Sequence, residues 1–151
     1  MKAFILYGST LGSSKRVAEA ISREIRCVST ICNARDVIID GVNISEFDLF
    51  IFVASTWGDG ELQIDMEGFL VRWKHIFNLQ QFVVCELGNY YGYDDFEFGA
   101  LNIMREELLS VGGLEMFEPL CFDSIPKKDW DTLKRWCLAL NNRISLINEY
   151  R

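Results

Sequence analysis

The segment Ala3–Ser14, AFILYGSTLGSS, decides the fold, because it predicts how the chain begins. Its first part, Ala3–Tyr7, is a continuous apolar run, as expected of a strand that is buried on both faces. A loop rich in glycine and hydroxyl groups follows over Gly8–Ser14, and apolar residues then recur at helical spacing over Lys15–Ile25. The chain therefore opens with a strand, a loop and a helix.

The same alternation continues to the end of the sequence. It predicts an α/β fold: a doubly wound five-stranded parallel sheet with helices on both faces, which is a three-layer αβα sandwich. Residues 1–151 are expected to form a single domain, because this length is typical of one core. The further predicted strands are Ser29–Asn33, Leu49–Ala54, Phe82–Cys85 and Leu114–Phe122, the further helices are Met66–Ile76, Phe96–Val111 and Lys127–Leu146, and Asp36–Glu46 is a polar connection.

Composition and charge narrow the classes of function. Half of the residues are hydrophobic, at 50%, which excludes disorder, and the longest apolar runs are far too short to span a membrane. The net charge of −7 disfavours nucleic acid and anionic membranes as partners and favours basic proteins. Met1 leads directly into the first strand without a signal peptide, so we expect a cytoplasmic protein. The five cysteines include no CxxC pair and there is one histidine, so neither a disulfide framework nor a zinc site is expected.

Three loops follow the carboxyl ends of predicted strands, where an open parallel sheet binds its ligand. They are Gly8–Ser14, Ser55–Gln63 and Glu86–Asp95. The first combines hydroxyls, glycines and a helix N-terminus, which suits a phosphate group. A serine-rich turn in which Ser13 or Ser14 caps the helix is the alternative. Neither the GxxxxGK[ST] motif of NTPases nor GxGxxG occurs in the chain.

The second and third loops carry aromatic side chains among glycines and acids. Trp57 lies beside two glycines, and three tyrosines occur within Gly88–Asp95. These side chains predict a surface that stacks on a planar ligand, although a tryptophan folded over the sheet edge is the alternative for Trp57. A phosphate loop beside two aromatic loops suggests a phosphorylated planar ligand. Flavin mononucleotide (FMN) fits better than a purine nucleotide, because the acidic loops would repel a triphosphate.

Over essentially its whole length the sequence resembles the flavodoxin family. The motifs are Ser9–Ser14 (STLGSS), Ser55–Gln63 (STWGDGELQ), and Gly88 with Gly92-Tyr93 and Asp95. Leu11 replaces a hydroxyl residue of the family pattern, and Asn89 replaces an aspartate. The resemblance implies FMN stacked between Trp57 and Tyr93, with Tyr90 as a second candidate, and no catalytic or metal-binding residue. The implied cofactor-binding residues are Ser9, Thr10, Leu11, Gly12, Ser13, Ser14, Ser55, Thr56, Trp57, Gly58, Asp59, Gly60, Glu86, Leu87, Gly88, Asn89, Tyr90, Tyr93 and Asp95.

The resemblance also implies a function. The unbroken segment Leu114–Phe122 is similar to that of short-chain flavodoxins, which are electron-transfer flavoproteins without a substrate of their own. It implies a low-potential one-electron carrier, a monomer, that meets redox proteins through transient contacts with their basic patches, with a ferredoxin/flavodoxin reductase as donor. The Gly58-Asp59 peptide would turn its carbonyl toward flavin N5. Two alternatives stay open: a flavodoxin-like activator that reduces or oxidises the metal cofactor of a partner enzyme, and a binding module without flavin.

Overall fold

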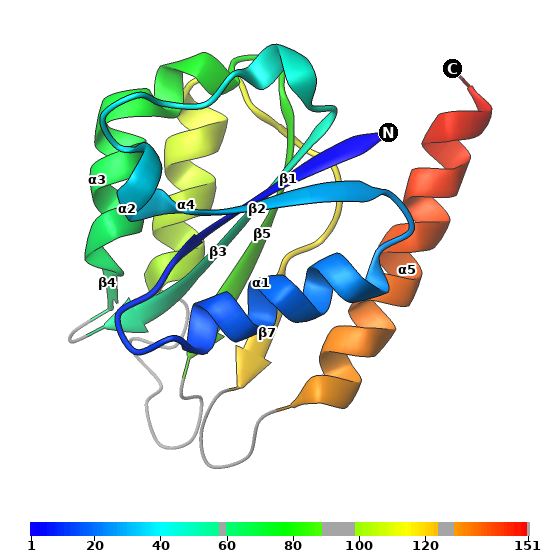
Figure 1. Cartoon of the computed structure of the whole chain (residues 1–151), viewed down its shortest axis with the longest axis horizontal. Helices are drawn as coiled ribbons and strands as arrows, with labels where there is room; N and C mark the ends of the chain where they lie inside the picture. The colour runs from blue at the N-terminus through cyan, green and yellow to red at the C-terminus, as the bar shows by residue number, and fades with distance from the viewer. Residues whose placement is uncertain (58–59, 89–98, 124–128, 151) are drawn as a thin grey trace.

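Strands and helices alternate along the chain, as the sequence predicts (Figure 1). The structure is a computed structural model, and it describes residues 1–57, 60–88, 99–123 and 129–150. Its strands are β1 (Lys2–Gly8), β2 (Val28–Asn33), β3 (Leu49–Trp57), β4 (Glu61–Leu62), β5 (Gln81–Gly88), β6 (Leu114–Glu115) and β7 (Leu120–Asp123). Its helices are α1 (Ser13–Glu24), α2 (Ala34–Val37), α3 (Ile64–Trp73), α4 (Gly99–Ser110) and α5 (Trp130–Glu149), with the 3-10 turns η1 (Ile44–Glu46) and η2 (Lys74–Phe77).

The sheet has the strand order β2-β1-β3-β5-β6, and β7 also pairs with β5. Apart from β4, which runs antiparallel to β3, the strands of the described segments pair in parallel. The chain moves from β1 to β2 on one side and to β3 on the other, so the direction of winding reverses beside β1. The predicted doubly wound parallel sheet is confirmed, and this reversal is where such sheets open a ligand crevice.

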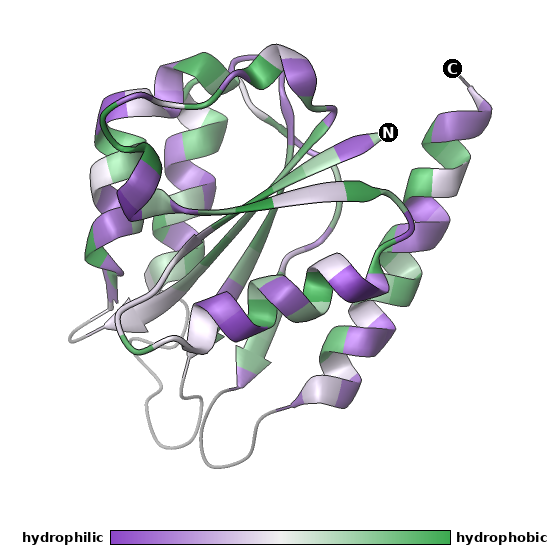
Figure 2. Ribbon diagram, viewed as in Figure 1, coloured by the Kyte–Doolittle hydropathy of each residue, from purple (hydrophilic) through white to green (hydrophobic). Residues whose placement is uncertain are grey.

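Helices cover both faces of the sheet (Figure 1). Side chains alternate between the faces along each strand. Ile5 and Ile51 belong to the core beneath α1 and α5, whereas Leu6 and Phe52 belong to the core beneath α2, α3 and α4. Figure 2 shows the hydrophobic strands at the centre and hydrophilic stretches on the helices around them. Both faces are apolar because both are buried, which explains the unbroken apolar runs of the sequence.

All three predicted loops begin later than expected, because the central strands are longer than their apolar runs. β1 includes Gly8, the first residue of the first predicted loop. β3 continues through Ser55 to Trp57, and a short antiparallel hairpin then returns as β4. β5 continues through Glu86 to Gly88. The predictions that Ser55–Gln63 and Glu86–Asp95 are loops from their first residues are therefore wrong. The ladder between β3 and β5 includes Ala54 with Glu86 and Ser55 with Leu87, so hydrogen bonding extends the strands beyond the apolar residues.

The last strand is interrupted, which corrects the prediction of one strand over Leu114–Phe122. β6 and β7 are separated by residues 116–119, although both pair with β5. Pro119 lies in the interruption, and a proline has no N–H to donate to a ladder. The indole Nε1 of Trp136 in α5 donates to the Glu118 carbonyl at 2.9 Å, so a side chain takes up one backbone acceptor there.

Several helix boundaries also differ from the predicted ones. α1 begins at Ser13 instead of Lys15, and α3 begins at Ile64 instead of Met66 and passes into η2 after Trp73. The polar connection over 36–46 contains the end of α2 and the turn η1. The pattern of buried apolar residues does not detect these starts, because α1 begins with the polar Ser13 and Ser14 and α3 begins with the exposed Ile64. Within the described residues, no helix is both long enough and apolar enough to cross a membrane.

Candidate functional site

The carboxyl ends of β1, β3 and β5 enclose a cavity of about 260 Å³. These ends lie beside the N-terminus of α1, at the lower edge of the molecule in Figure 1. All of the lining residues belong to the set that the sequence predicts for cofactor binding. They are Ser9, Thr10, Leu11, Ser13, Ser14, Ser55, Thr56, Trp57, Leu87 and Gly88. Parallel pairing brings the three loops together here, because it aligns the carboxyl ends of neighbouring strands.

The first loop leaves the N-terminus of α1 open toward the cavity. Gly12 is the N-cap residue and adopts the left-handed conformation, with φ of 89°. Among the described residues, no side chain caps this end of α1; instead, Ser9 Oγ accepts the Gly12 N–H at 2.8 Å. The alternative in which Ser13 or Ser14 caps the helix is therefore wrong. The first-turn N–H groups and the helix dipole make such an end attractive to an anion.

The second loop supplies a flat aromatic wall. Trp57 ends β3, pairs with Glu61 across the hairpin, and lines the cavity with 40% of its surface exposed. Its indole Nε1 donates to Ser55 Oγ at 2.7 Å, which fixes the ring. The indole is thus held at the cavity mouth, where a planar ligand could stack on it. Leu11, on the first loop, is 76% exposed beside the same cavity.

Gln63 joins the first two loops, a role that the sequence reasoning missed. Its side chain is only 1% exposed, and its Oε1 accepts the Met66 N–H at 3.0 Å as the N-cap of α3. Its Nε2 donates to Asp65 Oδ2 at 3.0 Å and to Thr10 Oγ1 at 3.4 Å. A Cβ on Gly8 would lie 2.1 Å from Gln63 Oε1, so only glycine admits this arrangement. The available signal was a glutamine three residues before the first apolar residue of the predicted helix.

The end of β5, which the sequence predicts as the start of the third loop, contributes a buried carboxyl group. Glu86 is completely buried in β5, and it accepts a hydrogen bond from the Thr56 hydroxyl. Leu87 and Gly88 follow it and line the cavity. Gly60, from the second loop, lies outside this cavity and lines a different hollow. The predicted site residues Gly58, Asp59, Asn89, Tyr90, Tyr93 and Asp95 lie outside the described residues, as do the stacking role of Tyr93 and the turn of the Gly58-Asp59 peptide.

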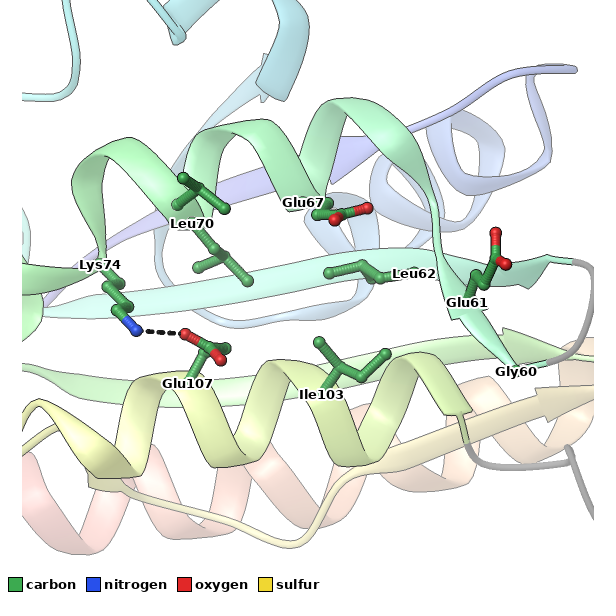
Figure 3. A pocket seen from close by; sticks show the side chains of 9 residues that line it. Gly60, Glu61, Leu62, Glu67, Leu70, Lys74, Ile103 and Glu107 are labelled. Carbon is green, nitrogen blue, oxygen red and sulfur yellow. Dashed lines mark hydrogen bonds and ion pairs between the residues drawn. The ribbon is translucent and has the colours of Figure 1, made fainter.

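A larger hollow of about 550 Å³ lies beside this site, between α3 and α4 (Figure 3). Its lining includes the hairpin residue Glu61, and Glu67 on α3. Leu62, Leu70, Val71 and Ile103 form its apolar part. The ion pair between Lys74 Nζ and Glu107 Oε2, at 2.5 Å, joins η2 to α4 at the end opposite Gly60.

The cysteines behave as interior side chains. All five are free thiols. Cys85 is buried, and burial raises the pKa of its thiol well above the ordinary value, with Cys121, Cys137 and Glu86 adding smaller electrostatic contributions. Burial likewise raises the pKa of Cys137 to about 12. Such thiols stay protonated at neutral pH and are weak nucleophiles. Cys121 is half-buried.

Comparison with known proteins identifies the family. The flavodoxin family model matches residues 5–132. The chain belongs to the flavodoxin family. A flavodoxin of Synechocystis is 30% identical over 121 residues, which cover 74% of this chain and 66% of that protein. The chain thus spans slightly less than two thirds of this relative.

Two further relatives match almost end to end. A flavodoxin of Nitratidesulfovibrio vulgaris is 27% identical over 140 residues, covering 87% of this chain and 91% of its own. The crystal structure of a Fusobacterium nucleatum flavodoxin bound to flavin mononucleotide superposes with a TM-score of 0.72 at 14% identity, covering 93% of this chain and 97% of that one. Length and fold therefore match a short-chain flavodoxin.

Proposed function

We propose that this chain binds FMN in the cavity at the ends of β1, β3 and β5 and serves as a low-potential one-electron carrier between redox proteins. In this proposal residues 1–151 form one FMN-binding domain without a substrate of its own. One observation carries it: every residue that lines the cavity belongs to the set of cofactor-binding residues that the flavodoxin resemblance implies. The Fusobacterium nucleatum relative, whose structure holds FMN, supports the choice of ligand.

The described residues fit this cofactor. The open N-terminus of α1, with Ser9, Thr10 and Gly12–Ser14 around it, would take the phosphate. Trp57 would stack on one face of the flavin ring and exclude water from it. FMN supplies the one-electron and two-electron chemistry, and the protein sets which step is favourable. The proposal includes the motif residues beyond the described segments, with Tyr93 on the opposite face and Tyr90 as its substitute.

We expect the protein to bind FMN at least about tenfold more tightly than riboflavin. Only FMN carries the phosphate, and hydrogen bonds to a charged group contribute roughly 1.5–3 kcal/mol each, where 1.4 kcal/mol is a factor of ten. Titration of the apoprotein with each flavin, followed by fluorescence or calorimetry, measures both affinities. Visible flavin absorption of the purified protein would support the proposal directly, and equal affinities for the two flavins would contradict the role of the first loop.

Gly12→Ala sharpens this test. A Cβ at Gly12 would have space, since its nearest neighbour is Arg16 Nη2 at 3.8 Å, but φ of +89° is unfavourable for alanine. Forcing a residue other than glycine into this left-handed conformation costs about 1–2 kcal/mol of conformational free energy. The variant should therefore lose FMN affinity by about tenfold while its riboflavin affinity changes less. An equal loss for both flavins would show that the loop acts on the ring and not on the phosphate.

The activator alternative is not favoured. The relatives described above are flavodoxins. The segment Thr56-Trp57-Gly58-Asp59, through its resemblance to the flavodoxin loop, also favours the carrier. If the chain were a binding module without flavin, the purified protein would be colourless and would not bind added FMN. The absorption spectrum therefore separates this alternative from the carrier.

Basic redox proteins, such as a ferredoxin/flavodoxin reductase as donor, are the proposed partners of a monomeric carrier. The net charge is −7, and Glu61 and Glu67 are exposed at the hollow beside the second loop (Figure 3). Val71 and Ile103 add apolar surface between these carboxylates and the Lys74–Glu107 pair. Such a surface suits the transient, electrostatically guided contact that an electron carrier needs.

Glu67→Gln should slow association with a reductase that has a basic patch by about twofold at low salt, because rim charges act mainly on the encounter rate. Stopped-flow kinetics at increasing ionic strength measures this effect, which should fade as salt screens the charges. Glu149→Gln is the matched control, since it removes the same charge from the far end of α5 (Figure 1). Equal slowing in both variants, or rates that do not depend on salt, would contradict docking at this surface.

A further inference from the structure

Glu86 is a buried carboxyl group in the middle of the molecule. It is 0% exposed and lies in β5, where it pairs with Ala54 of β3 and Cys121 of β7. Side chains alternate along a strand, so Glu86 shares the face of Val84, which packs toward α3 and α4. Burying a carboxyl group is costly unless hydrogen bonds compensate it. Its contacts therefore indicate what the residue does.

A directed chain of hydrogen bonds leads from α4 to this carboxyl group. The Ala100 N–H donates to Thr56 Oγ1 at 3.0 Å, and the Thr56 hydroxyl donates to Glu86 Oε1. A threonine hydroxyl has one proton, so while it donates to Glu86 its oxygen is free to accept from Ala100. The carboxyl oxygen of Glu86 thus sets the orientation of the Thr56 hydroxyl, which accepts the hydrogen bond from the Ala100 N–H of α4. Three elements, β5, β3 and α4, meet in this relay.

A second contact brings α4 against the same hairpin. A Cβ on Gly99 would lie 2.2 Å from the Gly60 carbonyl oxygen, so the two backbones touch. Gly60 lies in the hairpin that follows Thr56 and Trp57. Its φ of +90° shows a turn that favours glycine. The start of α4 is therefore held against the second loop by packing at Gly99 and by the hydrogen bond at Ala100.

In the sequence, Glu86 and Ala100 lie on either side of the third loop. Glu86 lies two residues before the end of β5, and Ala100 is the second residue of α4. The chain between these elements contains Asn89, Tyr90, Tyr93 and Asp95, which the sequence predicts as flavin ligands. The relay joins the end of β5 and the start of α4 to Thr56, which itself lines the cavity.

We propose that Glu86 is a positioning residue of the flavin cavity, which acts through Thr56 to hold the N-terminus of α4 beside the second loop. This proposal rests on the proposed FMN site. The role of Glu86 is to accept a hydrogen bond, and it needs no contact with the flavin. Preorganisation of this kind strengthens binding without adding a contact to the ligand.

The test compares Thr56→Val with Thr56→Ser. Valine keeps the shape of the side chain but removes the hydroxyl, whereas serine keeps the hydroxyl. In the apoprotein, amide hydrogen exchange at Ala100 should accelerate in Thr56→Val and stay slow in Thr56→Ser. Affinity for FMN should fall about tenfold or more in the valine variant, because the Ala100 N–H loses its acceptor, and only slightly in the serine variant.

Glu86→Met supplies the second arm, and Glu106→Gln on the exposed side of α4 is its control. Like Thr56→Val, Glu86→Met should accelerate amide hydrogen exchange at Ala100 and weaken FMN binding. The double variant should lose little more than either single one, because both changes break one relay. Glu106→Gln should change neither measurement.

Unchanged Ala100 exchange in Thr56→Val, or equal FMN affinity of the valine and serine variants, would overturn the proposal. Additive losses in the double variant would overturn it as well. A wild-type protein that binds no FMN would overturn the proposed function instead. The exchange measurement separates the two cases, since it uses the apoprotein.

Discussion

Gly99→Ala is expected to lower the free energy of unfolding by about 2–3 kcal/mol and to weaken FMN binding. The new Cβ would lie 2.2 Å from the Gly60 carbonyl oxygen and 2.6 Å from both Gly60 C and Gly60 Cα. These are backbone atoms, so no side-chain rotation relieves the contact. Either α4 or the hairpin after Trp57 must move. Trp57, which begins the hairpin, and Thr56, which accepts a hydrogen bond from Ala100 of α4, both line the proposed flavin cavity. Chemical denaturation of the apoprotein and FMN titration measure the two effects.

Gly68→Ala is the matched control, because it makes the same substitution at a helical position with space. A Cβ on Gly68 would meet Ile38 Cδ1 at 3.5 Å, an ordinary contact. Alanine favours a helix interior over glycine by roughly 0.5–1 kcal/mol, so this variant should be slightly stabilised. A Gly99→Ala protein as stable as Gly68→Ala, with unaltered FMN affinity, would show that the close approach of α4 to the hairpin has no consequence.

Phe77→Ala is expected to destabilise the protein by about 3–5 kcal/mol, the range for truncating a buried phenylalanine. Phe77 is 1% exposed in η2, and its ring centroid lies 5.1 Å from that of Phe50, 5.2 Å from that of Phe52 and 6.1 Å from that of Phe69. The substitution removes these ring contacts and leaves a cavity beneath α3 and α4. The urea midpoint of the apoprotein, with the slope held fixed, measures the loss.

Leu138→Ala on α5 provides the comparison. This leucine is 56% exposed, and exposed positions change stability within about 0.5 kcal/mol. If Phe77→Ala were no worse than Leu138→Ala, the ring cluster would not be part of the stabilising core. Phe77 lies just beyond the helix that the sequence predicts over Met66–Ile76, so this experiment also tests a core residue that periodicity did not assign.

Local pattern was enough for the architecture and for most of the described cavity. Runs such as Ala3–Tyr7 and Leu49–Ala54 are apolar because both faces of the sheet are covered, and this property is visible in a few consecutive residues. The motifs around Gly12 and Trp57 are equally local. If the strands pair in parallel, these two motifs must lie close together, because the carboxyl ends of neighbouring strands lie at one edge of the sheet.

Boundaries that depend on hydrogen bonding were predicted less well. β3 and β5 continue past their apolar runs because each finds a partner in the other, and Pro119 lies where the last strand is interrupted. Gly12, and not a serine, caps α1, and Gln63 caps α3. The ends of strands and the caps of helices depend on backbone geometry and on which hydrogen-bond partners are available. Residue type alone does not specify either of these.

The sequence by itself determined the alternating α/β order, the buried strands and the loops at which a flavin would bind. Only the tertiary structure decided how those loops are held together. Thr10 meets Gln63 53 residues later, and Thr56 joins Glu86 and Ala100, 30 and 44 residues away. No periodicity relates residues at such separations. Their contacts exist because the packed sheet and helices bring distant polar groups into burial, where each must find a partner.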